Sequence, residues 1–115
     1  MSKLSILLNI MEKNTLREKT LRIPKYFMIG GIKVEVVPKP GMLNDRKCIG
    51  LCVYREQRIY IDTEAGPEET VEQALIHEMV HWILFIMNNE LVNDEKFVDL
   101  FAHLAYQILD SAVYE

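Results

Sequence analysis

The chain has 115 residues, of which 50% are hydrophobic and 26% charged, and its formal net charge is −4. This length suits one small domain with a single hydrophobic core. The acidic net charge, with no cluster of lysine and arginine, argues against binding of nucleic acid through electrostatic attraction to its phosphates. No apolar run approaches the roughly 18 residues that a membrane span needs. We therefore expect a globular protein with neither nucleic acid nor a membrane as its partner.

Residues 1–24 are expected to form an N-terminal helical segment whose role the sequence leaves open. Leu4, Leu7, Leu8 and Met11 fall at helical spacing, which is typical of a short amphipathic helix. No small-residue cleavage site follows, so the segment is not expected to be a signal peptide. Packing on the domain is the simplest use of such a helix, and binding to a membrane or a partner is the alternative.

The next region of the chain is rich in β-forming residues. Gly30 and Gly31 separate two apolar runs in KYFMIGGIKVEVVP, which predicts a β-hairpin. Pro38, Pro40 and Gly41 then break the pattern, and GMLNDRK is predicted to be a loop. CIGLCVY and RIYID predict a second pair of strands, and alternate residues of RIYID face opposite ways.

Two helices are predicted in the C-terminal half. Gly66 and Pro67, followed by two glutamates, are typical of a helix start, and the helix should run to about Asn88. Asn93 or Asp94 can cap the next helix. That helix carries an apolar set consisting of Phe97, Leu100, Phe101, Leu104 and Ile108. Strands followed by helices predict an α+β domain over residues 25–115.

The only cysteines are Cys48 and Cys52, within KCIGLCVY. Four positions apart on a strand, they would lie about 13 Å from each other, which is too far for a disulfide. We expect two buried, reduced thiols that do not bind metal, in keeping with a cytoplasmic protein.

The first predicted helix contains HEMVH, in which His77 and His81 flank Glu78. Residues four apart on a helix differ by about 40° and project from one face, so both imidazoles can bind one zinc ion. Glu78 lies at the margin of that face, where it can hold water without being a ligand. Without a metal, each buried polar group would need a hydrogen-bonding partner. The other faces should pack in the core through Leu75, Met79, Trp82 and Ile86.

A catalytic zinc usually has three protein ligands, so a third should come from the second helix. Glu95 and His103 are about 12 Å apart along the axis and cannot both reach one ion. Glu95 fits better, because the short connection returns the chain beside His81. Asp99, one turn further on, can then accept a hydrogen bond from a ligating imidazole.

These residues resemble a known family. HEMVH, the spacing of Glu95 and Asp99, and the following Phe101-Ala102 are similar to the ImmA/IrrE-like zinc metallopeptidases, especially short versions encoded by phages and prophages. The hairpin IGGIKVEVV and the strand QRIYID extend the resemblance over about residues 25–110. It implies a minimal zincin: a mixed or antiparallel sheet of three or four strands packed on the HExxH helix and a C-terminal helix, with Zn²⁺ as cofactor.

The first functional hypothesis is a zinc-dependent endopeptidase with Glu78 as general base. A protein or peptide substrate would add as a strand to an exposed sheet edge, for which RIYID is the candidate. The resemblance implies limited proteolysis of a regulatory protein, such as a helix-turn-helix repressor. The residues that could stabilise the oxyanion are Tyr54, Tyr60, Tyr106 and His103, and the sequence does not choose among them.

The second hypothesis is a catalytically silent protein-binding module of phage origin that uses zinc as a structural staple. Small domains commonly need such a staple, because their cores are small. The intact Glu78 favours the peptidase, because a structural site needs no base and closes all four positions with protein ligands.

Overall fold

The structure is a computed structural model and describes residues 22–114, so the predicted N-terminal helix lies outside the described residues. The predicted hairpin is formed by β1 (Tyr26–Ile29) and β2 (Ile32–Pro38). Gly30 and Gly31 make its turn with positive φ angles of 55° and 78°, which glycine adopts without strain.

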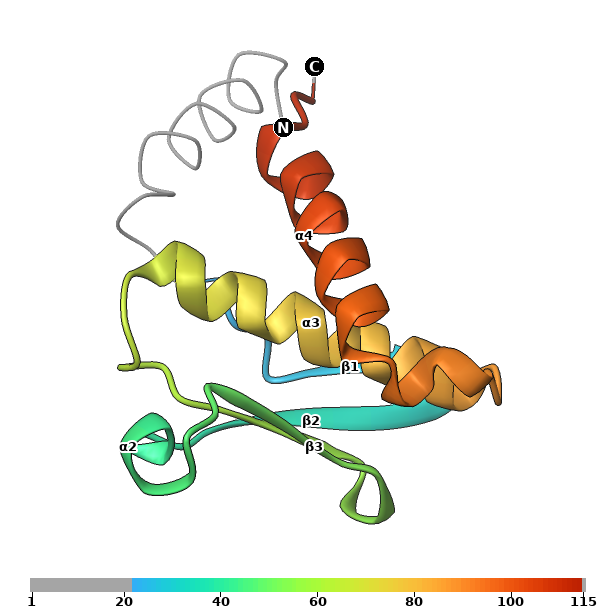
Figure 1. Cartoon of the computed structure of the whole chain (residues 1–115), viewed down its shortest axis with the longest axis horizontal. Helices are drawn as coiled ribbons and strands as arrows, with labels where there is room; N and C mark the ends of the chain where they lie inside the picture. Colours follow the sequence, from blue (N-terminus) through green and yellow to red (C-terminus); the bar gives the residue numbers. More distant parts are fainter. Residues whose placement is uncertain (1–21, 115) are drawn as a thin grey trace, which may run out of the picture.

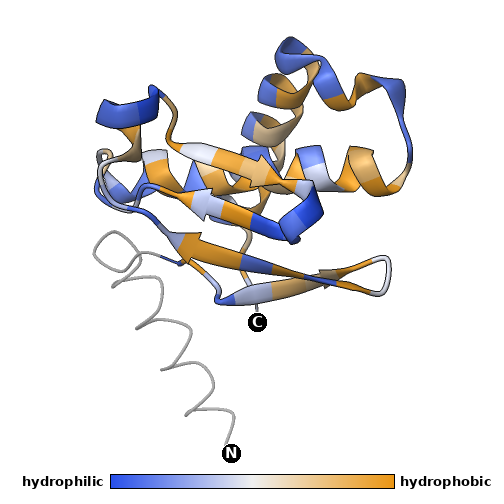
Figure 2. Cartoon of the chain, turned by 90° about the horizontal axis from the view of Figure 1, so that it is seen from below, coloured by the Kyte–Doolittle hydropathy of each residue, from blue (hydrophilic) through white to orange (hydrophobic). Residues whose placement is uncertain are grey.

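The sheet has four strands, because β3 (Gly50–Val53) and β4 (Arg58–Ile61) join the hairpin in the order β1-β2-β4-β3 (Figure 2). β2 and β4 are parallel, and the other two pairs are antiparallel. The prediction that RIYID is an edge strand is wrong, since β4 pairs on both sides. Among the described residues, β3 is the edge strand on that side of the sheet.

The predicted loop GMLNDRK instead contains a short helix, α2 (Met42–Arg46). Gly41 enters it with a φ of 88°. The Leu43 N–H donates to the Asp62 carboxylate at 2.9 Å, and the Met42 side chain is buried. Tertiary contacts therefore hold this single turn, and its own sequence carries no helical pattern that could have predicted it.

Two long helices lie on one face of the sheet (Figure 1). α3 (Glu68–Ile86) runs over the strands, and α4 (Glu95–Ser111) crosses it and projects beyond it. A 3₁₀ turn at Glu90–Asn93 connects them. Asp94 caps α4 as predicted, because its side chain accepts a hydrogen bond from the Phe97 N–H. The predicted α+β fold is confirmed, and of the predicted possibilities, three or four strands in a mixed or antiparallel sheet, the structure has a mixed sheet of four.

The hydrophobic core has two parts, one on each side of α3. The first lies between α3 and the sheet and consists of Val34, Val36, Ile59, Ile61, Val71, Leu75 and Trp82. The second lies between α3 and α4 and consists of Val80, Leu84, Val98 and Ala102. The predicted packing surface of α3 is confirmed, with Met79 and Ile86 partly buried against the first part.

α4 buries a different face from the one its large apolar residues occupy. Its buried residues are Val98, Ala102 and Tyr106. The five large side chains named above from the sequence are all exposed, and we call them the exposed stripe of α4: Phe97, Leu100, Phe101, Leu104 and Ile108. None of the described helices is long and apolar enough to span a membrane.

A buried carboxylate joins the start of the described chain to both long helices. Glu72 on α3 accepts hydrogen bonds from Arg22 Nε at 2.8 Å and from the Tyr106 hydroxyl of α4 at 3.0 Å. Burial alone would raise the pKa of Glu72, but these hydrogen bonds outweigh it and the net pKa is lowered. Glu72 in turn helps to raise the pKa of Tyr106 to about 12, after burial as the larger cause.

The lowered pKa makes the contribution of Glu72 depend on pH. We expect Glu72→Gln to destabilise the fold by about 1–3 kcal/mol at pH 7, because a charged acceptor is lost from a buried site. A carboxyl with a lowered folded pKa stabilises the fold above its unfolded pKa of about 4.3, and that stability is lost as the pH falls below it. Urea unfolding at pH 7 and pH 3 should therefore show the difference from the parent shrinking in acid. Glu69→Gln, at an exposed neighbouring position, is the matched control. A deficit that stays constant across this range would contradict the assignment.

Candidate metal centre

α3 and α4 bring His77, His81 and Glu95 together at one end of their crossing. His77 Nε2 lies 3.1 Å from one carboxylate oxygen of Glu95, and His81 Nε2 lies 3.1 Å from the other. The imidazole rings are edge to face with centroids 4.9 Å apart. The structure thus places the three residues predicted as ligands in mutual contact.

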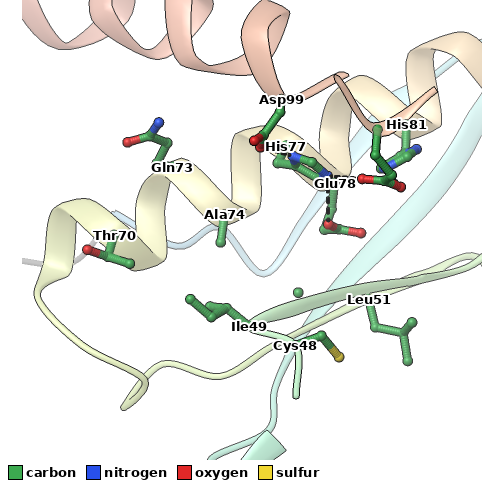
Figure 3. Close-up of a pocket in the computed structure, with 12 residues that line it drawn as sticks. Cys48, Ile49, Leu51, Thr70, Gln73, Ala74, His77, Glu78, His81 and Asp99 are labelled. Carbon is green, nitrogen blue, oxygen red and sulfur yellow. Dashed lines mark hydrogen bonds and ion pairs between the residues drawn. The ribbon is translucent and has the colours of Figure 1, made fainter. Parts of the chain in front are cut away.

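The other nitrogen of each imidazole has its own acceptor. His77 Nδ1 lies 3.0 Å from a carboxylate oxygen of Asp99, and His81 Nδ1 lies 2.8 Å from the backbone carbonyl of Val92. A carbonyl or carboxylate cannot donate, so both Nδ1 atoms carry the proton and orient the rings. Asp99 occupies the supporting position predicted from its spacing (Figure 3).

This protonation pattern tests whether a cation fits. With Nδ1 carrying a proton, each imidazole turns Nε2 toward a negatively charged oxygen of Glu95, so a positive charge, either a second proton or a metal cation, must lie between them. Tetrahedral ligands about 2.1 Å from zinc lie about 3.4 Å from one another. The observed separations of 3.1 Å are close to that value. Two nitrogens and a carboxylate in this arrangement fit zinc.

Glu78 lies beside the imidazoles but is further from them than Glu95 is. Its carboxylate is 3.9 Å from His77 Nε2, and ligand atoms of Glu78 and both histidines all lie within 4.8 Å of one another. Glu95 contacts both imidazoles more closely, at 3.1 Å. Burial raises the pKa of Glu78, and the two histidines oppose that shift. Glu78 is therefore a buried carboxyl beside the two imidazoles, and its role as a base stays a prediction.

Gly50 on the edge strand fixes where Glu78 can lie. A Cβ atom at position 50 would come within 2.7 Å of Glu78 Cγ, closer than real side chains approach. Cys52, two residues further along β3, donates its thiol to the Glu78 carbonyl at 3.3 Å. β3 therefore packs directly on α3 beside Glu78, and no local pattern around Gly50 indicates this close approach.

The cluster lines an open cleft of about 630 Å³ between α3 and β3 (Figure 3). Besides the histidines and acids, its walls come from Cys48, Ile49, Gly50 and Leu51 on the β3 side and from Thr70, Gln73 and Ala74 on α3. Gln73 lies one turn before His77 on the same face, so the helical spacing could have indicated it, yet it was not predicted.

None of the tyrosines considered for oxyanion stabilisation lines the cleft. Tyr54 stacks on Phe85 at a centroid distance of 4.1 Å, Tyr60 donates to Glu56, and Tyr106 donates to Glu72. His103 does not contact the cluster either.

His103 bonds instead to Gln73, with 2.6 Å between Gln73 Nε2 and His103 Nδ1. Gln73 is therefore the amide that His103 orients at the wall of the cleft.

The two cysteines are free thiols, so no disulfide joins them. Burial is the main cause that raises the pKa of Cys52 well above its ordinary value, which keeps this thiol protonated. Cys48 lies in the wall of the cleft. Neither belongs to the group of possible ligands found among residues 22–114.

Comparison with known proteins adds no assignment. No model of a known protein family, no characterised protein and no solved structure matches the chain. The site therefore has to be interpreted from its own geometry.

The geometry predicts the ligand set. His77→Ala or His81→Ala should abolish stoichiometric zinc binding, and Glu95→Ala should weaken it strongly, because each removes a direct donor. Asp99→Ala should cost only about 10–100-fold in affinity, since it orients His77 without touching the ion. Zinc content and titration calorimetry measure both effects. The matched controls are His103→Ala and a double Cys48→Ala, Cys52→Ala variant, which should keep full affinity. Loss of zinc from either control, with Glu95→Ala unaffected, would show that the ligand set is wrong.

Proposed function

We propose that this protein is a zinc-dependent endopeptidase. The observation that carries the proposal is the arrangement of two imidazoles around the Glu95 carboxylate, with the buried carboxyl of Glu78 beside them in an open cleft. A purely structural polar cluster would not need a second carboxyl beside the first. The Glu78 carboxylate lies 3.9 Å from His77 Nε2, further away than Glu95. Such a carboxyl suits a base.

The chemistry divides among the residues of the cleft. His77, His81 and Glu95 would hold the zinc ion, which when bound supplies a Lewis acid and lowers the pKa of water. Glu78 accepts a proton from the attacking water and passes it to the departing amine. The absence of a side chain at Gly50 leaves the space that the Glu78 carboxylate occupies.

The edge strand β3 provides a place for a peptide beside this glutamate. Ile49 and Asp62 are directly opposite in the antiparallel register of β3 and β4, and the Asp62 N–H donates to the Ile49 carbonyl at 2.8 Å. Hydrogen-bonded pairs alternate along such a ladder, so Gly50 and Cys52 turn their backbone groups to the outer edge. We propose that an extended substrate pairs there as an added strand.

The class of substrate follows from the kind of site and from the resemblance to the ImmA/IrrE-like peptidases. A strand-pairing cleft selects unfolded or extended segments rather than folded surfaces, so the substrate must offer an exposed stretch of chain. We propose limited proteolysis of a regulatory protein, such as a helix-turn-helix repressor, at a segment of this kind.

One observation favours the alternative, a catalytically silent zinc-stapled binding module. Glu78 lies near enough to the two histidines to be grouped with them as a possible ligand. If its carboxylate closed the fourth position, no site for water would remain. The ion would then only tie α3 to α4, and the cleft would bind a partner without cleaving it.

Glu78→Gln separates the two functions. This variant keeps the size and hydrogen bonding of the side chain and removes its basicity. We expect it to retain zinc and the fold but to lose peptidase activity by about 10²–10⁴-fold, the usual contribution of a general base. Parent or variant is incubated with a bacterial cell lysate and, separately, with a pool of unstructured peptides. The new peptide termini are then compared by mass spectrometry.

The control for this comparison is Glu69→Gln, which makes the same chemical change on the exposed surface of α3. It should cleave as the parent does. If the parent and Glu78→Gln, both loaded with zinc, produce the same set of peptide termini, the binding module is favoured. A marked loss of zinc affinity in Glu78→Gln would show that Glu78 is itself a ligand.

Gly50→Ala tests the contact that holds Glu78. A methyl group at position 50 would meet the glutamate at 2.7 Å, so the carboxylate must move. We expect retained zinc, because the three ligands lie elsewhere, and a clear loss of activity in the same assay. Gly66→Ala is the matched control, since its new Cβ would meet only Thr70 Cβ, at 4.0 Å. Full activity of Gly50→Ala would show that the position of Glu78 is not critical.

A further inference from the structure

The exposed stripe of α4 is an apolar surface that nothing in residues 22–114 covers. Leu100 is 62% exposed and Ile108 68%, although the opposite face of the same helix is buried against α3. By helical spacing, the stripe lies on the side of α4 opposite Glu95 and Asp99. α4 projects beyond α3 toward its C-terminal end (Figure 1). A contiguous apolar surface of this kind marks a binding site.

The chain that precedes the described residues enters beside this helix. Arg22 donates three hydrogen bonds to Glu72, from its backbone N–H at 3.0 Å, from Nε at 2.8 Å and from Nη2 at 3.5 Å. Its guanidinium also lies 3.6 Å from the carboxylate of Asp110, in the last turns of α4. Residues 1–21 therefore start next to the C-terminal third of α4.

The composition of residues 1–21 matches the stripe. Leu4, Leu7, Leu8 and Met11 follow a helical spacing, so they can form one apolar face. The stripe of α4 presents large apolar side chains of the same kind, so the two surfaces can pack against each other.

The connecting chain is long enough. The stretch from Met11 to Arg22 can span about 36 Å when extended. α4 has 17 residues and is therefore about 25 Å long. The apolar residues of the segment can reach any part of the stripe from the anchor at Arg22.

We infer that residues 4–11 dock on the exposed stripe of α4 in the same chain. A segment tethered at Arg22 has an effective concentration in the millimolar range, which gives it an advantage over a second copy of the chain. Docking would brace α4, the helix that carries Glu95 and Asp99, without entering the cleft. The inference does not depend on the proposed peptidase activity.

Photo-crosslinking in the full chain tests this placement. Leu104, in the middle of the stripe, is replaced by the photoreactive p-benzoylphenylalanine, and Ile108 is replaced in a second variant in case the first does not fold. An equal mixture of ¹⁵N-labelled and unlabelled protein is irradiated and the cross-linked peptides are identified by mass spectrometry. We expect cross-links to residues 1–21 with both peptides of one isotope, since the contact lies within one chain.

Two further variants make the result specific. Leu7→Asp with Leu8→Asp should abolish these cross-links, because the charges interrupt the apolar face. Ser5→Asp with Asn9→Asp adds the same charge off that face and should leave them unchanged. Cross-links of mixed isotope between two α4 helices would overturn the inference in favour of a dimer. The absence of any cross-link to residues 1–21, with the photoreactive chain folded, would also overturn it.

Discussion

The contact of two imidazoles with one carboxylate depends on how closely α3 and α4 approach each other. His77 and His81 are on α3, and Glu95 is in the first turn of α4, with both Nε2 atoms 3.1 Å from its oxygens. The small core between the helices sets this spacing, and Ala102 in it has almost no side chain to hold them apart. The crossing of the helices and the candidate metal centre are therefore one structural feature, because a bulkier contact there would separate the imidazoles from the carboxylate.

The parts of the site that could be predicted from sequence are those fixed by local periodicity. His77 and His81 share a face because they are four residues apart, and Asp99 follows Glu95 by the same interval. The cap at Asp94 is also local, because its side chain bonds to an N–H three residues on. Strand order is not local. Nothing within RIYID distinguishes an internal strand from an edge strand, since this depends on which strands pair with it. The requirement for glycine at position 50 likewise depends on the packing of β3 against α3, which the local sequence does not indicate.

α4 shows how an apolar pattern can indicate a helix correctly and yet fail to identify its buried face. Its large residues lie on one side, and the buried side uses Val98, Ala102 and Tyr106. Crossing another helix closely favours small side chains at the contact, so the bulkiest residues need not be those that are buried. The periodicity of α4 predicted one apolar face where the fold has two, one buried and one exposed.

Charge attraction alone cannot position Glu95. Its side chain is 70% exposed and that of Asp99 is 80% exposed, whereas His81 is only 10% exposed. Ion pairs between exposed groups contribute about 0–1 kcal/mol, which is too little to order a chain of several residues. The Asp94 cap and the burial of Val98 in the second core fix the first turn of α4. The backbone therefore brings Glu95 beside the two histidines through contacts that need no ion, so the energy of ion binding would not be spent on folding that turn.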